Sequence, residues 1–203
     1  MLHLVALPSL LACCFIGNAG MRTEDAQRLT LRIYPYVASE LFLRWNEQEL
    51  GAVVQQALMA LAAIGLLQYD ASRDVWSRPP PTSAEATQLS LLAQCTLQIV
   101  ERYYLAIALL VRAGTGQMNQ KTLAEQCQLM AQRMTLLYGF NSPEFFDRAL
   151  FANFINLLRE RKVLHADDQG RLLFDEVLVR VADDAELVLS EQIRHSILQV
   201  VHD

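Results

Sequence analysis

Residues 46–78, NEQELGAVVQQALMALAAIGLLQYDASRDVWSR, change from one residue period to another part-way along. They open on Asn46-Glu-Gln-Glu49, a capping box with asparagine in place of serine or threonine. Apolar residues then recur at helical spacing, at Leu50, Val53, Val54, Ala57, Leu58 and Leu61. Residues 66–69 and 75–78 instead flank a polar turn, which is typical of a β-hairpin. The stretch therefore predicts a helix that ends at Gly65 and is followed at once by a hairpin.

A similar pattern returns later in the chain. A second apolar stripe at helical spacing consists of Phe151, Phe154, Ile155 and Leu158. Asp167 then falls where Asp70 fell, residues 167–170 supply a turn, and residues 171–174 supply a return strand. Each helix–hairpin pair has the shape of a winged helix. A true structural repeat and a chance recurrence of a common junction both remain open.

The stretches around the first unit are predicted as helices. Thr23-Glu-Asp25 marks a helix start. Pro35 should kink or break that helix, and residues 37–45 continue it. Thr82-x-x-Glu85 is a second capping box, which opens a long helix. That helix runs to a flexible break at residues 113–117.

The C-terminal half also favours helices. One predicted helix carries an apolar face made of Leu123, Cys127, Met130, Ala131, Met134 and Leu137. Gly139 can close this helix, Ser142 can cap the next one, and Pro143 fits the first turn after that cap. Ser190 can cap a last helix.

The predicted fold is therefore mainly α: a helical domain with one or two small β-hairpins and winged-helix-like units. Residues 1–81 form a helical segment with the first helix–hairpin unit. Residues 82–203 form a helical segment with the second. Together we expect them to make one compact domain, which a chain of 203 residues is long enough to build around a real core.

The composition limits the kind of partner that the chain can bind. Hydrophobic residues make up 53% and charged residues 19%, and the net charge is −5. An acidic chain is poorly suited to nucleic acid, and also to anionic lipid bound by charge alone. The high apolar content is consistent with a helical domain that docks on another surface, and equally with a tightly packed helical monomer.

The first sixteen residues, Met1 to Ile16, are nearly all apolar. A signal peptide would carry a basic residue near its start, yet the first basic side chain of Lys or Arg type is Arg22. A transmembrane helix needs about 20 apolar residues, whereas this run soon meets Asn18 and Gly20. The favoured interpretation is a buried or partner-facing helix that belongs to a longer chain.

No catalytic, cofactor-binding or metal-ligating set emerges from the sequence. The four cysteines (Cys13, Cys14, Cys95 and Cys127) form no Cys-x-x-Cys pair and are expected to be small buried residues. His165 near Asp167 and Asp168 is interpreted as a polar strand end rather than a metal site. Gly114-x-Gly116 lacks the rest of a phosphate-binding loop.

Two further groups have a functional and a structural interpretation. Arg102, Tyr103 and Tyr104 could face a lipid head group, although an amphipathic helix with tyrosines at the core edge is favoured. Three methionines, Met118, Met130 and Met134, are interpreted as core fillers rather than an adaptable binding surface.

The winged-helix pattern raises DNA binding as a rival function. A recognition helix needs basic residues to neutralise phosphates. The first candidate helix, residues 47–64, has no Lys or Arg. The second, residues 149–162, has Arg159, Arg161 and Lys162 only at its C-terminal end. Winged helices also serve as protein-docking modules, which suits this surface better.

Several stretches resemble one bacterial enzyme family. They are Leu4–Ala12, Gln132-Arg133, Leu137-Tyr-Gly139, Asn141-Ser-Pro-Glu-Phe-Phe-Asp147 and Leu158-Arg-Glu160. They resemble the C-terminal region of the bacterial membrane-bound glycerol-3-phosphate 1-O-acyltransferases. The resemblance implies a protein of phospholipid biosynthesis that transfers an acyl group from acyl-CoA or acyl-carrier protein to glycerol 3-phosphate, giving lysophosphatidate.

The catalytic motif of that family is missing from the chain. In the family, the His of a His-x-x-x-x-Asp motif is the base that activates the glycerol hydroxyl. The residues five positions after His3, His165 and His195 are Pro8, Gly170 and Val200, and the family's Phe-x-Glu-Gly run is absent too. The resemblance thus implies a C-terminal, non-catalytic portion with a structural, docking or membrane-positioning role.

The implied partner is the acyltransferase catalytic domain, and the membrane surface through it, with no nucleic acid and no cofactor. The implied location is the cytoplasmic face of the bacterial inner membrane for the full-length enzyme, and the cytoplasm for the isolated chain. An independent winged-helix module for protein interaction or regulation remains the alternative.

Overall fold

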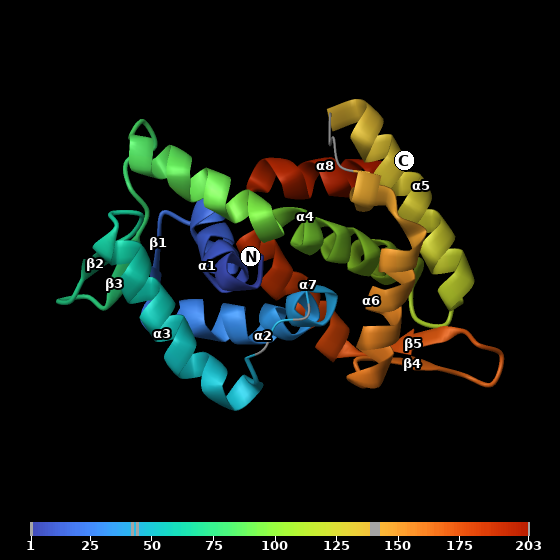
Figure 1. Cartoon of the computed structure of the whole chain (residues 1–203). Helices are drawn as coiled ribbons and strands as arrows, with labels where there is room; N and C mark the ends of the chain where they lie inside the picture. The colour runs from blue at the N-terminus through green and yellow to red at the C-terminus, as the bar shows by residue number, and fades with distance from the viewer. Residues whose placement is uncertain (1, 42, 44, 139–142, 203) are drawn as a thin grey trace. The chain divides into compact units, whose positions relative to one another are not determined.

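The computed structural model describes residues 2–41, 43, 45–138 and 143–202 (Figure 1). The fold is mainly α with small hairpins, as predicted. The helices are α1 (Leu2–Gly17), α2 (Thr23–Leu41), α3 (Glu47–Ala63), α4 (Ala84–Ala113), α5 (Gln120–Tyr138), α6 (Arg148–Glu160), α7 (Glu176–Val188) and α8 (Glu191–His202), with a 3₁₀ turn η1 at Pro143–Phe146. The strands are β1 (Gly20–Arg22), β2 (Gln68–Asp70), β3 (Val75–Ser77), β4 (Leu164–Ala166) and β5 (Leu172–Phe174).

The chain divides into two compact units. Unit 1 comprises Met1–Gln98 with Leu187–Ser190, and unit 2 comprises Ile99–Glu186 with Glu191–Asp203. The short returning segment is tied to unit 1 by Asn18, whose side-chain amide donates a 2.7 Å hydrogen bond to the carbonyl of Leu187. The boundary expected between residues 81 and 82 stays a prediction. The two units are defined by contacts within the structure, and these contacts do not test which segments fold independently.

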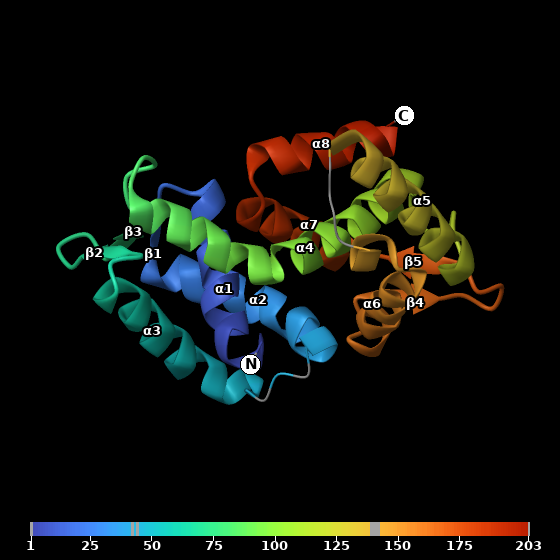
Figure 2. The same ribbon diagram turned by 45° about the horizontal axis from the view of Figure 1, so that its top comes forward.

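Unit 1 has the chain order α1, β1, α2, α3, β2, β3 (Figure 2). Its three strands form an antiparallel sheet in the order β1-β3-β2, so Trp76 of the central strand lies opposite Met21 on one side and Tyr69 on the other. A helix, a strand, two helices and a hairpin in this order are the arrangement of a winged helix. The hairpin predicted at residues 66–78 is confirmed.

The core of unit 1 is built around α1. The side chains of residues 6–15 are buried except that of Pro8, and α1 packs on both α2 and α3. Ser9, one of the few polar residues of α1, forms a 2.8 Å hydrogen bond with the hydroxyl of Thr96 and also donates to the carbonyl of Ala93. The apolar N-terminal segment is therefore a buried helix of this unit's own core.

Unit 2 contains the rest of α4, then α5, α6, β4 and β5, followed by α7 and α8. A short segment before α5 pairs with the hairpin, as β1 does in unit 1. The N–H of Gly116 donates to the carbonyl of Leu172 at 2.8 Å, and the N–H of Leu172 donates to the carbonyl of Met118 at 2.7 Å. The hairpin predicted at residues 163–174 is confirmed.

The two units share one register along the chain. The helices α2 and α5 both have 19 residues, and their first residues, Thr23 and Gln120, are 97 positions apart. The strands β3 and β5 start at Val75 and Leu172, with the same separation. After α3 and α6, Gly65 and Lys162 both have positive φ, 79° and 58°. These equal separations favour a structural repeat over a chance recurrence of the junction.

Local capping signals explain where several helices begin. In the confirmed capping box of α3, the side chain of Asn46 accepts from the N–H of Glu49 at 2.9 Å. The predicted cap of α4 is wrong by one residue, because Ser83 rather than Thr82 accepts from the N–H of Ala86. Ser83 is one residue closer to the helix, which begins at Ala84.

Parts of two predictions about prolines are wrong. The helix α2 continues through Pro35 and ends at Leu41, so a break at Pro35 and a helix to residue 45 are both wrong. The kink at Pro35 stays a prediction. Pro35 and its neighbours Tyr34 and Tyr36 are buried, and this packing offsets the hydrogen bond that proline removes. Pro143 begins the 3₁₀ turn η1 instead of the next α-helix.

The predicted stop and start around residue 140 is only partly covered by the structure, because Gly139 and Ser142 lie outside the described residues. The helix that follows, α6, begins at Arg148. Its cap is Asp147, whose carboxylate accepts from the N–H of Ala149 at 2.8 Å. The last helix, α8, begins directly after Ser190, where the sequence places it.

Candidate functional site

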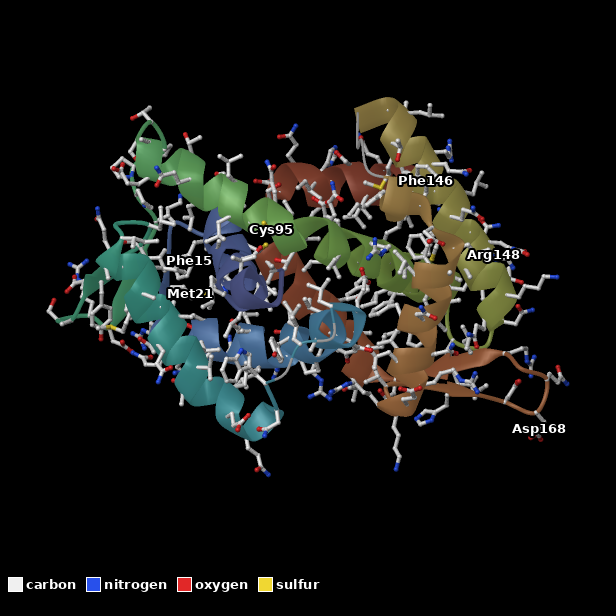
Figure 3. All side chains as sticks on the ribbon, in the orientation of Figure 1. Phe15, Met21, Cys95, Phe146, Arg148 and Asp168 are labelled. Carbon is white, nitrogen blue, oxygen red and sulfur yellow. The ribbon has the colours of Figure 1, made fainter. Side chains whose placement is uncertain are left out.

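The polar residues around His165 belong to a turn. In Figure 3, Asp168 lies at the tip of the turn between β4 and β5. One oxygen of Asp167 accepts from the N–H groups of Gln169 (3.0 Å) and Arg171 (2.8 Å), and the other pairs with the Arg171 guanidinium at 2.7 Å. The hydrogen bond from the backbone of Arg171 lowers the pKa of Asp167 most. Over the described part of the chain, no three His, Cys, Asp or Glu side chains converge as metal ligands.

The glycine pair Gly114 and Gly116 shapes the backbone before α5. Both have positive φ, 89° and 75°, which glycine adopts without steric cost. Gly116 is also the residue that pairs with Leu172 of the hairpin, as described above. The pair therefore positions the short segment that takes the place of β1 in unit 2.

The Arg102-Tyr103-Tyr104 run is buried in α4, with exposed fractions of 2%, 6% and 2%. The ring of Tyr103 stacks on Phe154 of α6, with centroids 4.0 Å apart and planes 7° apart. These tyrosines are core residues of unit 2, deeper than the core edge that the sequence suggests. They are not placed to meet a lipid head group.

Glu101 of α4 is a buried acidic residue. It is 2% exposed, and its Oε2 atom has no hydrogen-bond partner among the described residues. Burial raises the pKa of this carboxyl to about 7. A perturbed carboxyl can mark a functional site. Here, burial is the only cause of the shift and no charged partner contributes to it, so the raised pKa by itself does not identify an active site.

Three cysteines are buried as predicted, but Cys95 on α4 is exposed, so the prediction is wrong for that residue (Figure 3). All four are thiols. Burial is the main cause that raises the pKa of Cys14, to about 12, and it also raises the pKa of Cys127.

We expect a maleimide reagent at pH 7.5 to modify Cys95 faster than Cys14 or Cys127 by about two orders of magnitude or more. Buried thiols react only when the structure opens locally, and few are ionised at that pH. Mass spectrometry of the labelled peptides measures each site, and labelling in urea provides the control in which all four should react. Equal rates at Cys14 and Cys95 in the native chain would contradict the burial of Cys14.

Unit 1 contains a small cavity of about 170 Å³. Its lining includes Phe15, Arg78, Thr87 and Ser90. Arg78 donates a 2.9 Å hydrogen bond to the carbonyl of Ile16, near the C-terminal end of α1, and the hydroxyl of Ser90 donates to the carbonyl of Ala86. The polar groups of the cavity thus satisfy helix carbonyls, and they do not converge on a common point where a ligand would be held.

The helices in the recognition position of a winged helix are α3 in unit 1 and α6 in unit 2. Each bears a buried apolar stripe: Leu50, Val54, Leu58 and Leu61 in α3, and Phe151, Phe154, Ile155 and Leu158 in α6. The opposite side of each helix is exposed. With no catalytic or metal set in the described residues, these outward sides are the best candidates for a functional surface.

The family is decided by comparison with known proteins. The model of the family described as "Glycerol-3-phosphate acyltransferase C-terminal region" matches residues 1–167. The chain belongs to this family. Glycerol-3-phosphate acyltransferases from Pseudomonas putida and Pseudomonas syringae pv. tomato are 42% and 44% identical to it over 200 residues.

The chain is similar to only part of each acyltransferase. The matched 200 residues are 98% of this chain but 24% of the length of either Pseudomonas protein. No solved structure matches the chain. Of the helices that the structure describes, none is both long and apolar enough to cross a membrane.

Proposed function

We propose that this chain acts as the non-catalytic C-terminal part of a glycerol-3-phosphate acyltransferase. The observation that supports this most is the family match over residues 1–167, together with the 24% share of the relatives' length. The whole protein would transfer an acyl group from acyl-CoA or acyl-carrier protein to glycerol 3-phosphate. Its catalytic part would supply the His-x-x-x-x-Asp motif that this chain lacks.

In this proposal the chain supports the catalytic part by contact. Its net charge of −5 and the absence of Lys and Arg from α3 favour a protein partner over nucleic acid. Attachment to the cytoplasmic face of the bacterial inner membrane would come through the catalytic part. The alternative, an independent winged-helix module for protein interaction or regulation, would not require that partner.

A replacement experiment tests the proposal. The C-terminal region of the Pseudomonas putida acyltransferase would be exchanged for this chain, and the chimera would be expressed in a strain that lacks its own glycerol-3-phosphate acyltransferase. We expect the chimera to restore growth of this strain. A version that ends before the exchanged region should not restore it. A chimera that is produced at normal levels but fails to restore growth would favour the independent module.

We expect the isolated chain to have no acyltransferase activity. Without a positioned base, the hydroxyl of glycerol 3-phosphate is not activated for attack on the thioester. The purified chain would be incubated with labelled glycerol 3-phosphate and palmitoyl-CoA, and lysophosphatidate would be quantified beside the active chimera. Product formation that follows the isolated chain through successive purification steps would refute this prediction.

A further inference from the structure

The second half of α3 is apolar on its outward side. The exposed positions of the helix begin with the polar residues Gln48 and Glu49. They continue with Ala52, Gln56, Met59, Ala60, Ala63 and the C-cap residue Ile64, which are together called the α3 outer face. Met59 is 55% exposed and Ile64 is 66% exposed. Because the opposite stripe fills the core of unit 1, the second half of α3 is apolar on both sides, a pattern typical of a helix segment that is covered on both sides.

The matched helix of unit 2, α6, shows that the fold itself does not require exposed apolar residues at these positions. At the corresponding positions of α6, 97 residues later, Met59 is replaced by Asn156, Ala63 by Glu160 and Ile64 by Arg161. The Asn156 side chain accepts a 2.7 Å hydrogen bond from Gln120. At these three positions α6 is therefore polar, and Asn156 is already partnered within unit 2. Ala52 and Ala60 correspond to Ala149 and Leu157, so the contrast between the two helices lies at positions 59, 63 and 64.

A glycine beside the α3 outer face is a second, independent observation. Gly51 lies inside α3, where glycine costs about 1 kcal/mol relative to alanine. An added Cβ atom at Gly51 would meet nothing within 4 Å, so packing within the chain does not explain the glycine. The residue 97 positions later is Arg148 (Figure 3), which is the first residue of α6 rather than an interior one and pairs with Glu125 at 3.0 Å. Glycine at 51, with Ala52 nearby, allows another backbone to approach α3 closely.

The charges around the face decide between classes of partner. Residues 46–72 contain no Lys or Arg, whereas Glu49 and Asp70 lie in this stretch. A nucleic acid needs cations to neutralise its phosphates, and a helix that binds anionic membranes carries Lys or Arg on its polar side. An apolar helix of a protein partner, packed against small residues, needs neither.

We propose that the α3 outer face binds an apolar helix from the part of the acyltransferase that lies outside this chain. This inference rests on the function proposed above. About three quarters of the length of the Pseudomonas relatives lies outside the matched region, which spans 24% of it, so an occupant of sufficient size exists in those proteins. The face is the docking surface of the C-terminal region, and α6 is its polar counterpart.

The first test measures the accessibility of the face in the chimera that restores growth. Met59→Cys would be introduced into the isolated chain and into the chimera, with Asn156→Cys at the matched position of α6 as the control. We expect maleimide labelling at position 59 to be at least about tenfold slower in the chimera than in the isolated chain. Labelling at position 156 should be alike in both.

The second test uses Gly51→Gln. In the isolated chain this substitution should leave the melting temperature unchanged or raise it, because the site is open and glycine is a poor helix former. In the chimera that carries Met59→Cys, it should restore fast labelling at position 59, because the added side chain separates the two helices. A helix face without a partner would show no such effect.

The possible failures are distinguishable. A chimera that does not restore growth contradicts the proposed function and the docking inference that rests on it. A chimera that restores growth while position 59 labels as fast as in the isolated chain contradicts only the docking inference. Slow labelling of the isolated chain on addition of vesicles of phosphatidylethanolamine and phosphatidylglycerol would show that the face binds lipid, which also overturns the inference.

Discussion

Replacing Trp76 by alanine should lower the free energy of unfolding of unit 1 by about 3–5 kcal/mol, a large share of the roughly 5–15 kcal/mol typical of a domain. Trp76 is fully buried at the centre of the β1-β3-β2 sheet. Its ring stacks on Tyr69 with centroids 4.3 Å apart, and its indole N–H donates to the hydroxyl of Thr23 at 2.8 Å. The substitution removes the stacked ring and leaves a cavity beside a polar group.

The repeat supplies a matched control for this substitution. The residue 97 positions after Trp76 is Leu173, at the same place in the hairpin of unit 2 but 37% exposed. We expect Leu173→Ala to cost about 1 kcal/mol or less, as surface substitutions usually do. Urea unfolding followed by circular dichroism gives both values. Similar losses for the two variants would contradict the different roles assigned to these hairpins.

The second large effect concerns the buried carboxyl of Glu101. Its folded-state pKa of about 7 lies above the ordinary value of 4.5, so the folded chain binds the proton more tightly than the unfolded chain. The contribution of Glu101 to stability is therefore full below about pH 4.5, and it is lost as the pH rises toward and through 7. Between pH 5 and pH 8 this loss should be roughly 2–3 kcal/mol.

Glu101→Gln removes the titration while keeping the shape of the side chain. Relative to wild type, the variant should gain roughly 2–3 kcal/mol in free energy of unfolding between pH 5 and pH 8. Comparing each variant with wild type at both pH values cancels the titration of other groups. The exposed Glu160 at the end of α6 provides the control, since Glu160→Gln should show no comparable change. A pH-independent difference for Glu101→Gln would mean that this carboxyl is not protonated preferentially in the folded chain.

The sequence predicts structure best where the structure depends on residues that are close together in the chain. The change of period after Leu61 predicts the first hairpin, and the Asn46–Glu49 capping box predicts the start of α3, because both signals act over a few residues. The strand β1 could not be predicted in this way. Its three residues, Gly20–Arg22, are held by pairing with Val75–Ser77, more than fifty positions away in the chain.

The remaining errors also have physical reasons. Packing of buried neighbours carries α2 past Pro35, which local propensity alone forbids. The helix α7 was not predicted, although its sequence mixes apolar residues with acidic ones over thirteen positions. The α3 outer face was present in the sequence at Ala52, Met59 and Ala63 among others. It became visible only once the structure showed which side of α3 fills the core.

The spacing of 97 positions shared by α2 and α5 and by β3 and β5 makes each unit an internal standard for the other. Where two positions with equal backbone geometry hold different side chains, the difference separates what folding demands from what each surface needs. Gly65 and Lys162 show that the end of the helix requires a left-handed residue but tolerates a lysine there. Mutational scans of this chain can therefore be compared position against position within one molecule, without recourse to any other sequence.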